Sequence, residues 1–314
     1  MTQQTDHEWS KGALFAKAQV FVESMSDNDD TEWKFGLWSS FALEMLVRSA
    51  VARVSPALLA DTRDWTNVLY GLGLQPKKPK FVPKSAPITE LLSRVEELVQ
   101  EFTGEHANFC ASHFARRNSE VHTGSYPFAN VGTATWLPMF YSVCEVLLRS
   151  IGESLESLFG TEMAQRAKED IDALRDETAK SVKGTINAHK TVWEQKTEDE
   201  RITATSQAAT ASLRHYGHRV ACPSCGSTAL LNGKAAGEAK RTVDDDGIVE
   251  RQVMKPESFS CVACGLKIAG FSKLLAADLG NNFISTSHYD AVEYFEVDID
   301  ERIRSMMEDD NNEY

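Results

Sequence analysis

The sequence predicts an α+β protein in which a helical region precedes a small β domain. Apolar residues recur every three to four positions through residues 1–160, and no alternating strand pattern occurs there. Residues 161–213 carry dense charges of alternating sign. From residue 214, short β-branched and aromatic runs enclose paired cysteines. These changes divide the chain into a helical domain (1–160), a helical linker (161–213), a small β domain (214–300) and an acidic tail (301–314).

The composition limits the class of protein. The chain has 314 residues, 42% of them hydrophobic, which is enough for two domains with packed cores. Its net charge of −13 argues against a non-specific nucleic-acid coat, so any nucleic-acid site has to be a local basic island. No apolar run approaches the roughly 20 residues of a membrane span, and the N-terminus lacks a signal-peptide pattern. We therefore expect a soluble, cytoplasmic protein with no membrane partner.

The helical domain is predicted to be a series of amphipathic helices. Apolar stripes at helical spacing predict helices over residues 9–25, 32–54, 64–72, 88–102, 107–122 and 135–159. The helix over 32–54 has enough apolar residues to be central. Thr103 is the expected cap of the helix that contains residues 107–122, and Gly160 is expected to end the helix over 135–159.

One loop of this domain is basic. Residues 75–87 contain four prolines and the run Pro76-Lys77-Lys78-Pro79-Lys80, followed by Lys84. Either the loop is simply solvated and its lysines offset nearby acids, or it forms a local island for nucleic acid. In the second case Arg116 and Arg117 would add to it.

Residues 161–213 combine alternating charge with a narrow apolar edge. The apolar positions recur at ~3.75 residues, which predicts a long helix or a weak coiled coil. At ~1.5 Å per residue, a helix of this length would extend roughly 75–80 Å. The segment is either a helical spacer with one half-buried edge or a pairing surface between two chains.

The β domain is predicted to contain short strands at residues 228–231, 238–243 and 248–253. Asp244-Asp245-Asp246-Gly247 is the expected hairpin turn, in which Gly247 is free to take a positive φ. Residues 257–260 lead into the second cysteine pair. Further along, a short helix is expected over 271–279 and a strand over 291–297.

The six cysteines fall into two classes. Cys110 and Cys144 stand alone in helical patterns and are interpreted as small buried hydrophobes. The others form two Cys-x-x-Cys-Gly turns, separated by 35 residues: Cys222, Cys225, Cys261 and Cys264. Four thiolates at this spacing predict one structural Zn²⁺ per chain, with a redox dithiol or an iron–sulfur cluster as the alternatives. Because a four-thiolate shell is closed to water, no catalytic metal is expected.

Basic residues surround the first cysteine pair. His218 lies four residues before Cys222 and is either an alternative ligand or a solvated side chain. A small domain of this kind contacts nucleic acid or a protein partner. The basic residues favour RNA: Arg214, His215, His218, Arg219, Lys234, Lys240 and Arg241.

Residues 115–124 concentrate groups that suit phosphodiester chemistry. Arg117, Asn118 and His122 lie here, late in a predicted helix. Histidine transfers protons near neutral pH, and a guanidinium keeps a permanent charge for phosphate oxygens, so the pair needs no metal. On a regular helix Arg117 and His122 are separated by about 140°, and they therefore do not share one narrow face. This geometry favours a site shared by two copies of the chain.

Arg117-Asn118-Ser119-Glu120-Val121-His122 resembles the Arg-polar-x3-His motif of HEPN domains, and residues 1–160 have a suitable size and helical pattern. HEPN domains are helical bundles that commonly dimerise, and their nuclease members cleave RNA without metal in a cleft between two protomers. The resemblance implies that Arg117 binds the scissile phosphate. It also implies that His122 transfers protons during attack by the ribose 2′-OH and that Asn118 orients the histidine or the phosphate. The expected products carry a 2′,3′-cyclic phosphate and a 5′-hydroxyl.

The function implied by the resemblance is a metal-independent endoribonuclease that acts on RNA as a homodimer. Toxins and antiphage defence effectors are typical roles, and a C-terminal zinc ribbon would select the substrate or partner. The alternative is a non-catalytic adaptor that dimerises through the helical domain and binds RNA or a protein complex through the ribbon. In that case Arg117 is expected to pair with Glu120 or Glu105. Under either function, His106 and His113 are expected to be ordinary half-buried histidines or to extend an RNA groove.

Overall fold

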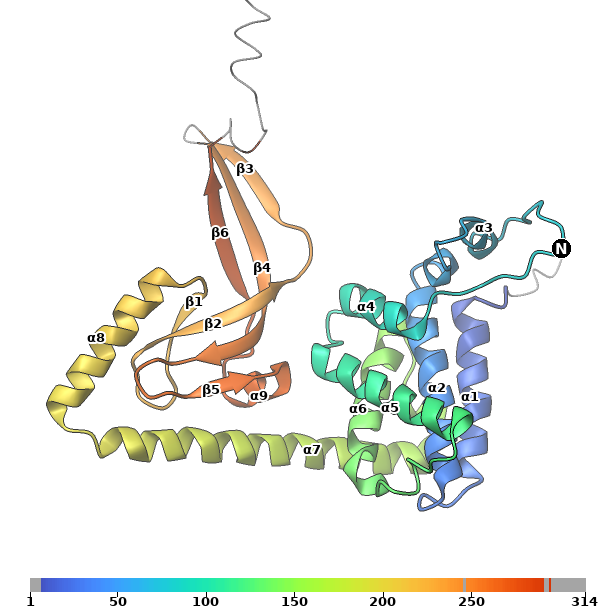
Figure 1. Ribbon diagram of the computed structural model, residues 1–314, viewed down its shortest axis with the longest axis horizontal. Helices are drawn as coiled ribbons and strands as arrows, with labels where there is room; N and C mark the ends of the chain where they lie inside the picture. The colour runs from blue at the N-terminus through green and yellow to red at the C-terminus, as the bar shows by residue number, and fades with distance from the viewer. Residues whose placement is uncertain (1–6, 245–246, 291–293, 295–314) are drawn as a thin grey trace, which may run out of the picture. The chain divides into compact units, whose positions relative to one another are not determined.

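The computed structural model describes residues 7–244, 247–290 and 294. The chain forms two compact units, Met1–Thr178 and Ala179–Tyr314. The first unit is helical, and the second contains the β-sheet (Figure 1), which confirms the predicted α+β class. The units divide within a helix, whereas the sequence suggested boundaries at residues 160 and 213. None of the helices in the described ranges combines the length and apolar character needed to cross a bilayer.

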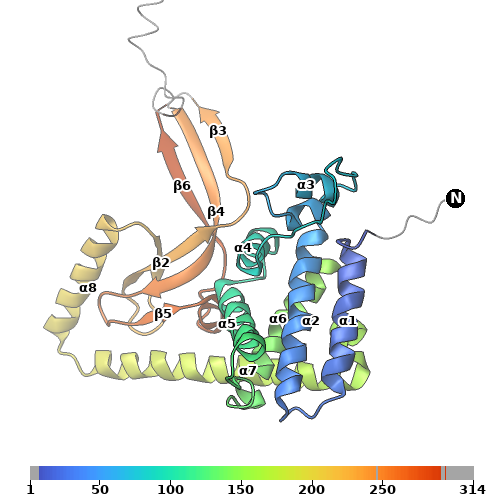
Figure 2. The same cartoon turned by 45° about the vertical axis from the view of Figure 1, so that its right-hand side comes forward.

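The first unit is a helical bundle. Its helices α1 and α2 are joined by a short loop and lie side by side in both views (Figures 1 and 2). The elements in chain order are α1 (Lys11–Ser26), α2 (Trp33–Ala52), η1 (Pro56–Leu59), α3 (Thr66–Gly71), α4 (Ile88–Leu98), α5 (Gly104–His122), η2 (Thr133–Thr135), α6 (Leu137–Ile151) and the first part of α7 (Leu155–Glu194).

The core of this unit is built around α2, as the apolar content of residues 32–54 predicted. α2 packs against α1, α4, α5 and α6. Gly36 of α2 also allows the loop after α5 to approach closely, because a Cβ there would lie 2.3 Å from the Phe128 ring. Ser39 and Ser49 are buried but satisfy their hydroxyls by donating to backbone carbonyls.

Two predicted helix ends in this unit are wrong. Residues 135–159 do not form one helix, because α6 ends at Gly152 in the left-handed region (φ 79). α7 then begins at Leu155 and continues through a kink at Gly160 (φ 73) instead of ending there. Similarly, α4 ends at Leu98, where Val99 becomes extended, and does not reach residue 102.

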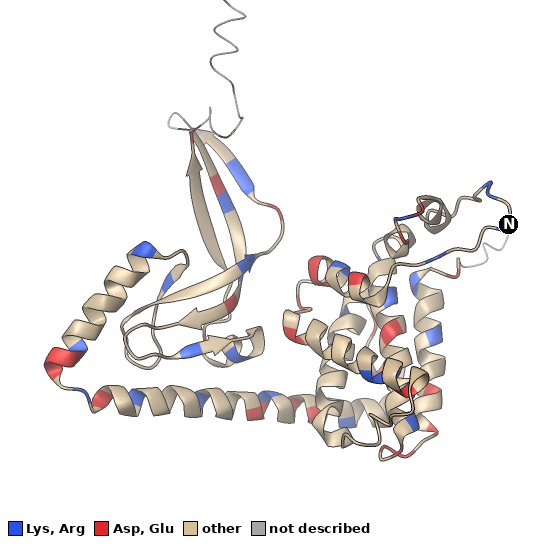
Figure 3. Cartoon of the chain, viewed as in Figure 1, with Lys and Arg blue, Asp and Glu red and all other residues tan. Residues whose placement is uncertain are grey.

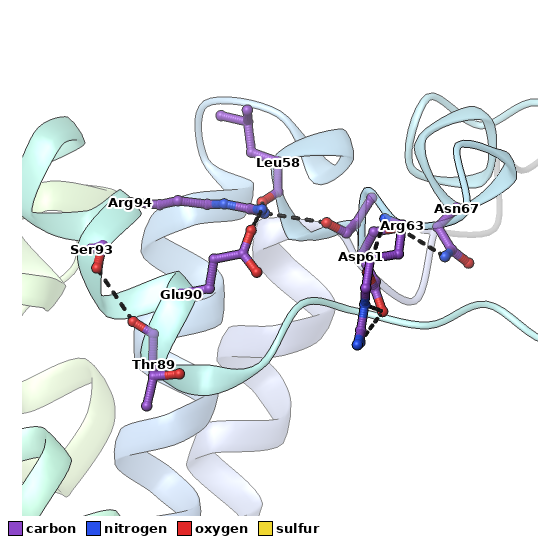
Figure 4. A network of polar contacts seen from close by, with 9 residues as sticks. Leu58, Asp61, Arg63, Asn67, Thr89, Glu90, Ser93 and Arg94 are labelled. Carbon is purple, nitrogen blue, oxygen red and sulfur yellow. Dashed lines mark hydrogen bonds and ion pairs between the residues drawn. The ribbon is translucent and has the colours of Figure 1, made fainter.

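Polar contacts hold the segment between α2 and α4 against the bundle (Figure 4). Arg94 on α4 donates to the carbonyl of Leu58 and pairs with Glu90. The buried Asn67 amide donates to the Asp61 carbonyl at 3.0 Å. The basic loop is part of this segment, and its Lys78 pairs with the Asp64 carboxylate at 2.8 Å. That contact agrees with the first of the two interpretations of the loop, in which its lysines offset nearby acids.

Residues 161–213 do not form one helix. α7 ends at Glu194, and α8 (Glu198–Arg214) starts after Thr197, whose hydroxyl accepts from the Glu200 N–H. The apolar edge of the segment packs into both cores of the chain. Ala164, Ala167 and Ile171 belong to the core of the first unit, and Val182 and Trp193 belong to that of the second. The predicted spacer is thus divided between the two units.

The described part of the second unit contains an antiparallel sheet and helices that pack with it. Its strands are β1 (His218–Ala221), β2 (Thr228–Ala235), β3 (Lys240–Asp244), β4 (Gly247–Ser260), β5 (Lys267–Ala269) and β6 (Phe283–Tyr289). The order is β1-β2-β4-β3, and the long β4 also pairs with β5 and β6. The C-terminal part of α7, α8 and the short α9 (Phe271–Ala276) complete the unit.

The expected strands at 228–231 and 248–253 are confirmed within β2 and β4, and the strand expected at 238–243 is confirmed only from residue 240, where β3 begins. Gly247 takes the expected positive φ, at 136°. The sequence did not predict β1, β5 or β6, whose residues are mostly exposed. Of the strand expected at 291–297 only residue 294 is described, and it is helical; the acidic tail over 301–314 lies outside the described residues.

Candidate functional site

The predicted catalytic residues lie at the C-terminal end of α5. This helix begins after Thr103, whose backbone N–H donates to His106 Nδ1 at 3.1 Å. It ends because Thr123 is extended, although the Thr123 N–H still donates to the Ser119 carbonyl at 3.0 Å. His122 is the last helical residue. Its side chain is exposed to solvent.

Arg117 is held by a carboxylate from α2. Its Nη1 donates to Glu44 Oε2 at 2.5 Å, and the two side chains are only 14% and 12% exposed. Its Nε donates to Asn118 Oδ1 at 3.1 Å. The guanidinium also lies over the rings of Phe41 and Phe114, at 5.3 and 5.7 Å from their centroids. Arg117 is therefore fixed in position by contacts on several sides.

The carboxylate partner of Arg117 differs from both candidates suggested by the sequence. Glu120 instead accepts a hydrogen bond from the Phe128 N–H at 3.2 Å. Glu44 lies 73 positions before Arg117. Spacing along one helix suggested Glu120 and Glu105, whereas the partner comes from a helix packed against α5. Only the tertiary packing brings Arg117 and Glu44 together.

Glu44 is shared by two arginines. Besides Arg117, its Oε1 accepts from Arg48 Nε and Nη2 at 3.0 and 2.7 Å. Burial opposes ionisation of Glu44, but the two guanidinium groups outweigh it and hold the pKa of this carboxyl below its ordinary value. The three side chains together carry one net positive charge. This cluster can attract an anion even though Arg117 itself is paired.

Within a single chain, only two of the three predicted catalytic residues are in contact. Arg117 and Asn118 are hydrogen-bonded, and Asn118 is exposed. Across the described ranges, no hydrogen bond or ion pair joins His122 to either of them. The sequence predicted that Arg117 and His122 lie on different faces of a regular helix. The structure agrees, since α5 stays helical up to residue 122.

Two further histidines of α5 are buried rather than half-buried. His113 is completely enclosed, and its Nε2 lies 2.9 Å from Ser39 Oγ. Since that hydroxyl donates to the Gly36 carbonyl, we infer that His113 carries its proton on Nε2. Burial, and secondarily the charges of Arg116 and Arg117, lower the pKa of His113 to about 3. A neutral, enclosed His113 cannot line an RNA groove.

The second candidate site is the cysteine cluster of the second unit. Cys222 and Cys264 bring their Sγ atoms to 3.6 Å, as do Cys225 and Cys261. All four sulfurs lie within 4.8 Å of one another. Sulfurs around a tetrahedral metal at ~2.3 Å would be roughly 3.8 Å apart, so the spacing fits such an ion. These residues could therefore hold a metal ion such as zinc.

Two matching turns position the sulfurs. The Gly226 N–H donates to the Cys222 carbonyl at 2.9 Å, and the Gly265 N–H donates to the Cys261 carbonyl at 3.0 Å. Both glycines have positive φ, 73° and 76°, a backbone conformation that residues with a side chain rarely adopt. The Ser224 N–H also points to Cys222 Sγ, at 3.4 Å. Backbone donors and the turn geometry thus prepare the thiols before any ion binds.

The thiols of the cluster do not ionise alike. The nearby Cys261 thiol lowers the pKa of Cys222 to about 5, and the Cys222 thiol in turn raises the pKa of Cys261. Burial raises the pKa of Cys264 to about 11. One thiolate is thus favoured and further ionisation is opposed, which is the situation that a bound cation relieves. By contrast, Cys110 and Cys144 are buried in the first core, as predicted, and burial raises the pKa of both.

The histidine that contacts the cysteine cluster is not the one that the sequence suggested. His218 stacks on Phe283 and is not part of the cysteine cluster. His189, on α7, has its Nδ1 2.9 Å from the Cys264 carbonyl and so supports the second turn. No local pattern marks His189, because it lies 75 positions from Cys264. No family model, curated protein or solved structure matches this chain.

Proposed function

We propose that this protein is a metal-independent endoribonuclease of the HEPN type, with an active site completed by a second copy of the chain. One observation carries the proposal: Arg117 and Asn118 are hydrogen-bonded near the end of α5, while His122 is exposed at its last residue. An exposed histidine at a helix end is accessible to a cleft between two copies. A site of this kind needs neither an internal pocket nor a catalytic metal.

The proposed reaction uses few groups. The ribose 2′-OH attacks the adjacent phosphorus, and the bond from phosphorus to the 5′ oxygen breaks. One His122 accepts the proton of the 2′-OH, and the His122 of the other copy donates a proton to the leaving 5′ oxygen. Arg117 stabilises the charge on the phosphate oxygens, and Asn118 orients the guanidinium to which it is bonded.

The charge around Arg117 supports a role in phosphate binding. Glu44 is shared with Arg48, so the cluster keeps one positive charge. Arg116 is half-buried beside it. In a chain with a net charge of −13, this is a local basic region. Because Arg48 also pairs with Glu44, the negative charge of Glu44 does not cancel the attraction of this region for a phosphate.

A second candidate function rests on the same ion pair. A side chain that is 14% exposed, paired with Glu44 and covered by two phenylalanine rings has the features of a structural arginine. In that case the helical unit is a non-catalytic adaptor, and His122 is an ordinary surface residue. Loss of His122 would then leave every activity of the protein unchanged.

For the second unit we propose that the cysteine cluster holds one structural Zn²⁺. The donor set carries this assignment, because four thiolates in a closed tetrahedral shell favour zinc over harder cations. The ion would neutralise the thiolates and tie β1 and β2 to β4 and β5. The redox-dithiol and iron–sulfur alternatives predict a different metal content.

The experiment that tests the proposed function is cleavage of labelled RNA with EDTA added only to the assay. His122→Ala and Asn118→Ala are the informative variants, because both side chains are exposed and their loss leaves the core intact. Asn108→Ala, also exposed on α5, is the matched control. We expect His122→Ala to abolish cleavage, Asn118→Ala to reduce it and Asn108→Ala to leave it unchanged. Undiminished cleavage by His122→Ala rejects the proposed site.

A further inference from the structure

The second unit contains a cavity that the proposed cleavage does not use. Its volume is about 640 Å³, within the range of ligand-binding sites. Residues from the end of α8, the following turn, β1, β2, β4 and β6 line it. Figure 1 shows how α8 leads directly into β1 and the sheet. The cavity thus lies where a helix end, a tight turn and strands converge.

Two glycines fix the shape of the cavity wall. Gly217 has φ 143, and a Cβ there would lie 2.7 Å from Asn232 Oδ1. At Gly233, where the pairing of β2 is irregular, a Cβ would lie 2.5 Å from the Lys255 carbonyl oxygen. Neither position accepts a side chain without a shift of its neighbours. The backbone therefore forms part of the wall.

The cavity is basic in an acidic chain. Arg214, His215, His218 and Arg219 line it, and none of its described lining residues is Asp or Glu. Figure 3 shows the asymmetry of α8, which has acidic residues at its start and a basic residue at its end. Arg219 Nε and Nη2 donate to the Ser212 carbonyl at 3.3 and 3.2 Å, which holds its guanidinium in place. The local charge favours an anionic ligand.

Aromatic surfaces accompany these charges. His218 and Phe283 stack with their ring centroids 4.7 Å apart and an interplanar angle of 11°. Tyr216 is 100% exposed. A fully exposed tyrosine next to a basic cavity contributes nothing to the core of the unit. The combination provides flat surfaces for a planar group beside positive charges for its anion.

We propose that this cavity binds one nucleotide of a single-stranded nucleic acid. The base stacks on Tyr216 and the His218–Phe283 pair, and the phosphate contacts Arg214 and Arg219. Proteins that bind single strands combine these two features, because every base has a face to stack and every nucleotide a phosphate to neutralise. An acidic peptide would use the arginines alone. The site is distinct from Arg117 and His122, so binding and cleavage are separable.

Binding is tested by fluorescence anisotropy with a short labelled 2′-O-methyl RNA and a DNA strand of the same sequence. The 2′-O-methyl strand lacks the attacking hydroxyl, so the measurement does not depend on whether the protein cleaves RNA. Tyr216→Ala is expected to weaken binding roughly 5- to 100-fold, while Tyr216→Phe, which keeps the ring, binds like the wild type. Arg214→Ala is expected to weaken binding. It should also reduce the slope of log affinity against log salt concentration by the amount that corresponds to about one phosphate contact.

Lys273→Ala is the matched control, because Lys273 is exposed on α9 of the same unit and does not line the cavity. It should bind like the wild type, and the metal content of each variant verifies that the unit is intact. Binding of either strand with the expected variant pattern supports the proposal, and the comparison of RNA with DNA identifies the preferred backbone. Wild-type binding by both Tyr216→Ala and Arg214→Ala, or no binding of either strand, overturns it. Displacement of the strand by poly-glutamate as effectively as by unlabelled strand would also overturn it and assign the cavity to an acidic peptide.

Discussion

Arg117 Nη1 on α5 donates a hydrogen bond to Glu44 Oε2 on α2 at 2.5 Å, with both side chains largely buried. This contact joins the helix that carries the predicted catalytic residues to the central helix of the bundle. Arg117 consequently has a structural role whether or not it also binds phosphate. The two roles predict different consequences for the same substitutions.

Arg117→Ala should lower the free energy of unfolding by about 1.5–3 kcal/mol, because it removes a hydrogen bond to a charged, buried group. The loss of stability should be smaller than for a buried carboxylate that keeps no partner, since Arg48 still pairs with Glu44. Urea denaturation followed by tryptophan fluorescence measures the change. Arg116→Ala, one position away and half-buried, is the control. Equal stability of the two variants would show that the Glu44 contact does not contribute.

His113 should make the first unit sensitive to acid. Its pKa in the folded chain is about 3, lowered mainly by burial, whereas an unfolded histidine has a pKa of about 6.5. The unfolded chain therefore binds the proton first. The stabilising contribution is complete above pH 6.5 and is lost, by about 1.4 kcal/mol per pH unit, as the pH falls from 6.5 towards 3.

His113→Gln provides the comparison, because an amide can still donate to Ser39 but does not titrate. Between pH 7.5 and 5.5, the wild type should lose about 1.4 kcal/mol more stability than the variant. Equilibrium unfolding of both proteins at each pH gives the difference. If the two curves run parallel over this range, His113 is not held neutral by burial.

The metal centre should contain one zinc ion per chain. Cys222→Ser or Cys261→Ser should abolish it, because each removes a thiolate from a closed shell. The strands that hold the sulfurs should then lose their fixed arrangement. Elemental analysis and circular dichroism measure both effects. Cys110→Ala, which alters a buried cysteine of the first unit, should keep full metal content. Iron in place of zinc, or unchanged zinc in Cys222→Ser, contradicts this assignment.

A cleft shared by two copies requires self-association. The surface next to His122 includes the exposed Val121, 52% accessible, and Tyr126, 63% accessible. We therefore expect a dimer by sedimentation equilibrium, and Val121→Glu should weaken it by placing a charge beside the proposed cleft. Val243→Glu, at a similarly exposed position on β3, should not. A monomer at every protein concentration at which cleavage is measured is incompatible with the composite site.

Local patterns predicted most of the helices and the cysteine cluster. The apolar stripe of residues 32–54 correctly indicated the central helix, because burial there follows helical periodicity over many turns. The paired Cys-x-x-Cys-Gly turns predicted four sulfurs that lie within 4.8 Å of one another, because each turn fixes two sulfurs locally. Within the helix and within each turn, the signal comes from residues close together in the sequence.

The features that sequence reasoning missed depend on distant residues or on weak local signals. Glu44 meets Arg117 from 73 positions away, and His189 supports Cys264 from 75. Gly152, not Gly160, ends α6, and Ser154 then precedes α7, where its Oγ accepts a hydrogen bond from the Ser157 N–H at 3.3 Å. The mostly exposed β6 lacks a clear apolar alternation because only its pairing with β4 makes it a strand. The basic cavity combines residues from five elements and the turn after α8.

The central claim is that His122 is one of the proton-transfer groups of an RNA-cleaving site shared by two chains. Its most direct test is the chemistry of the ends that the wild type and His122→Ala produce on one labelled RNA in EDTA. We predict 2′,3′-cyclic phosphate and 5′-hydroxyl ends from the wild type and none from His122→Ala. His288→Ala, which removes an exposed histidine of β6, should cleave like the wild type. The same ends at the same rate from His122→Ala, or no cleaved ends from the wild type, would contradict the claim.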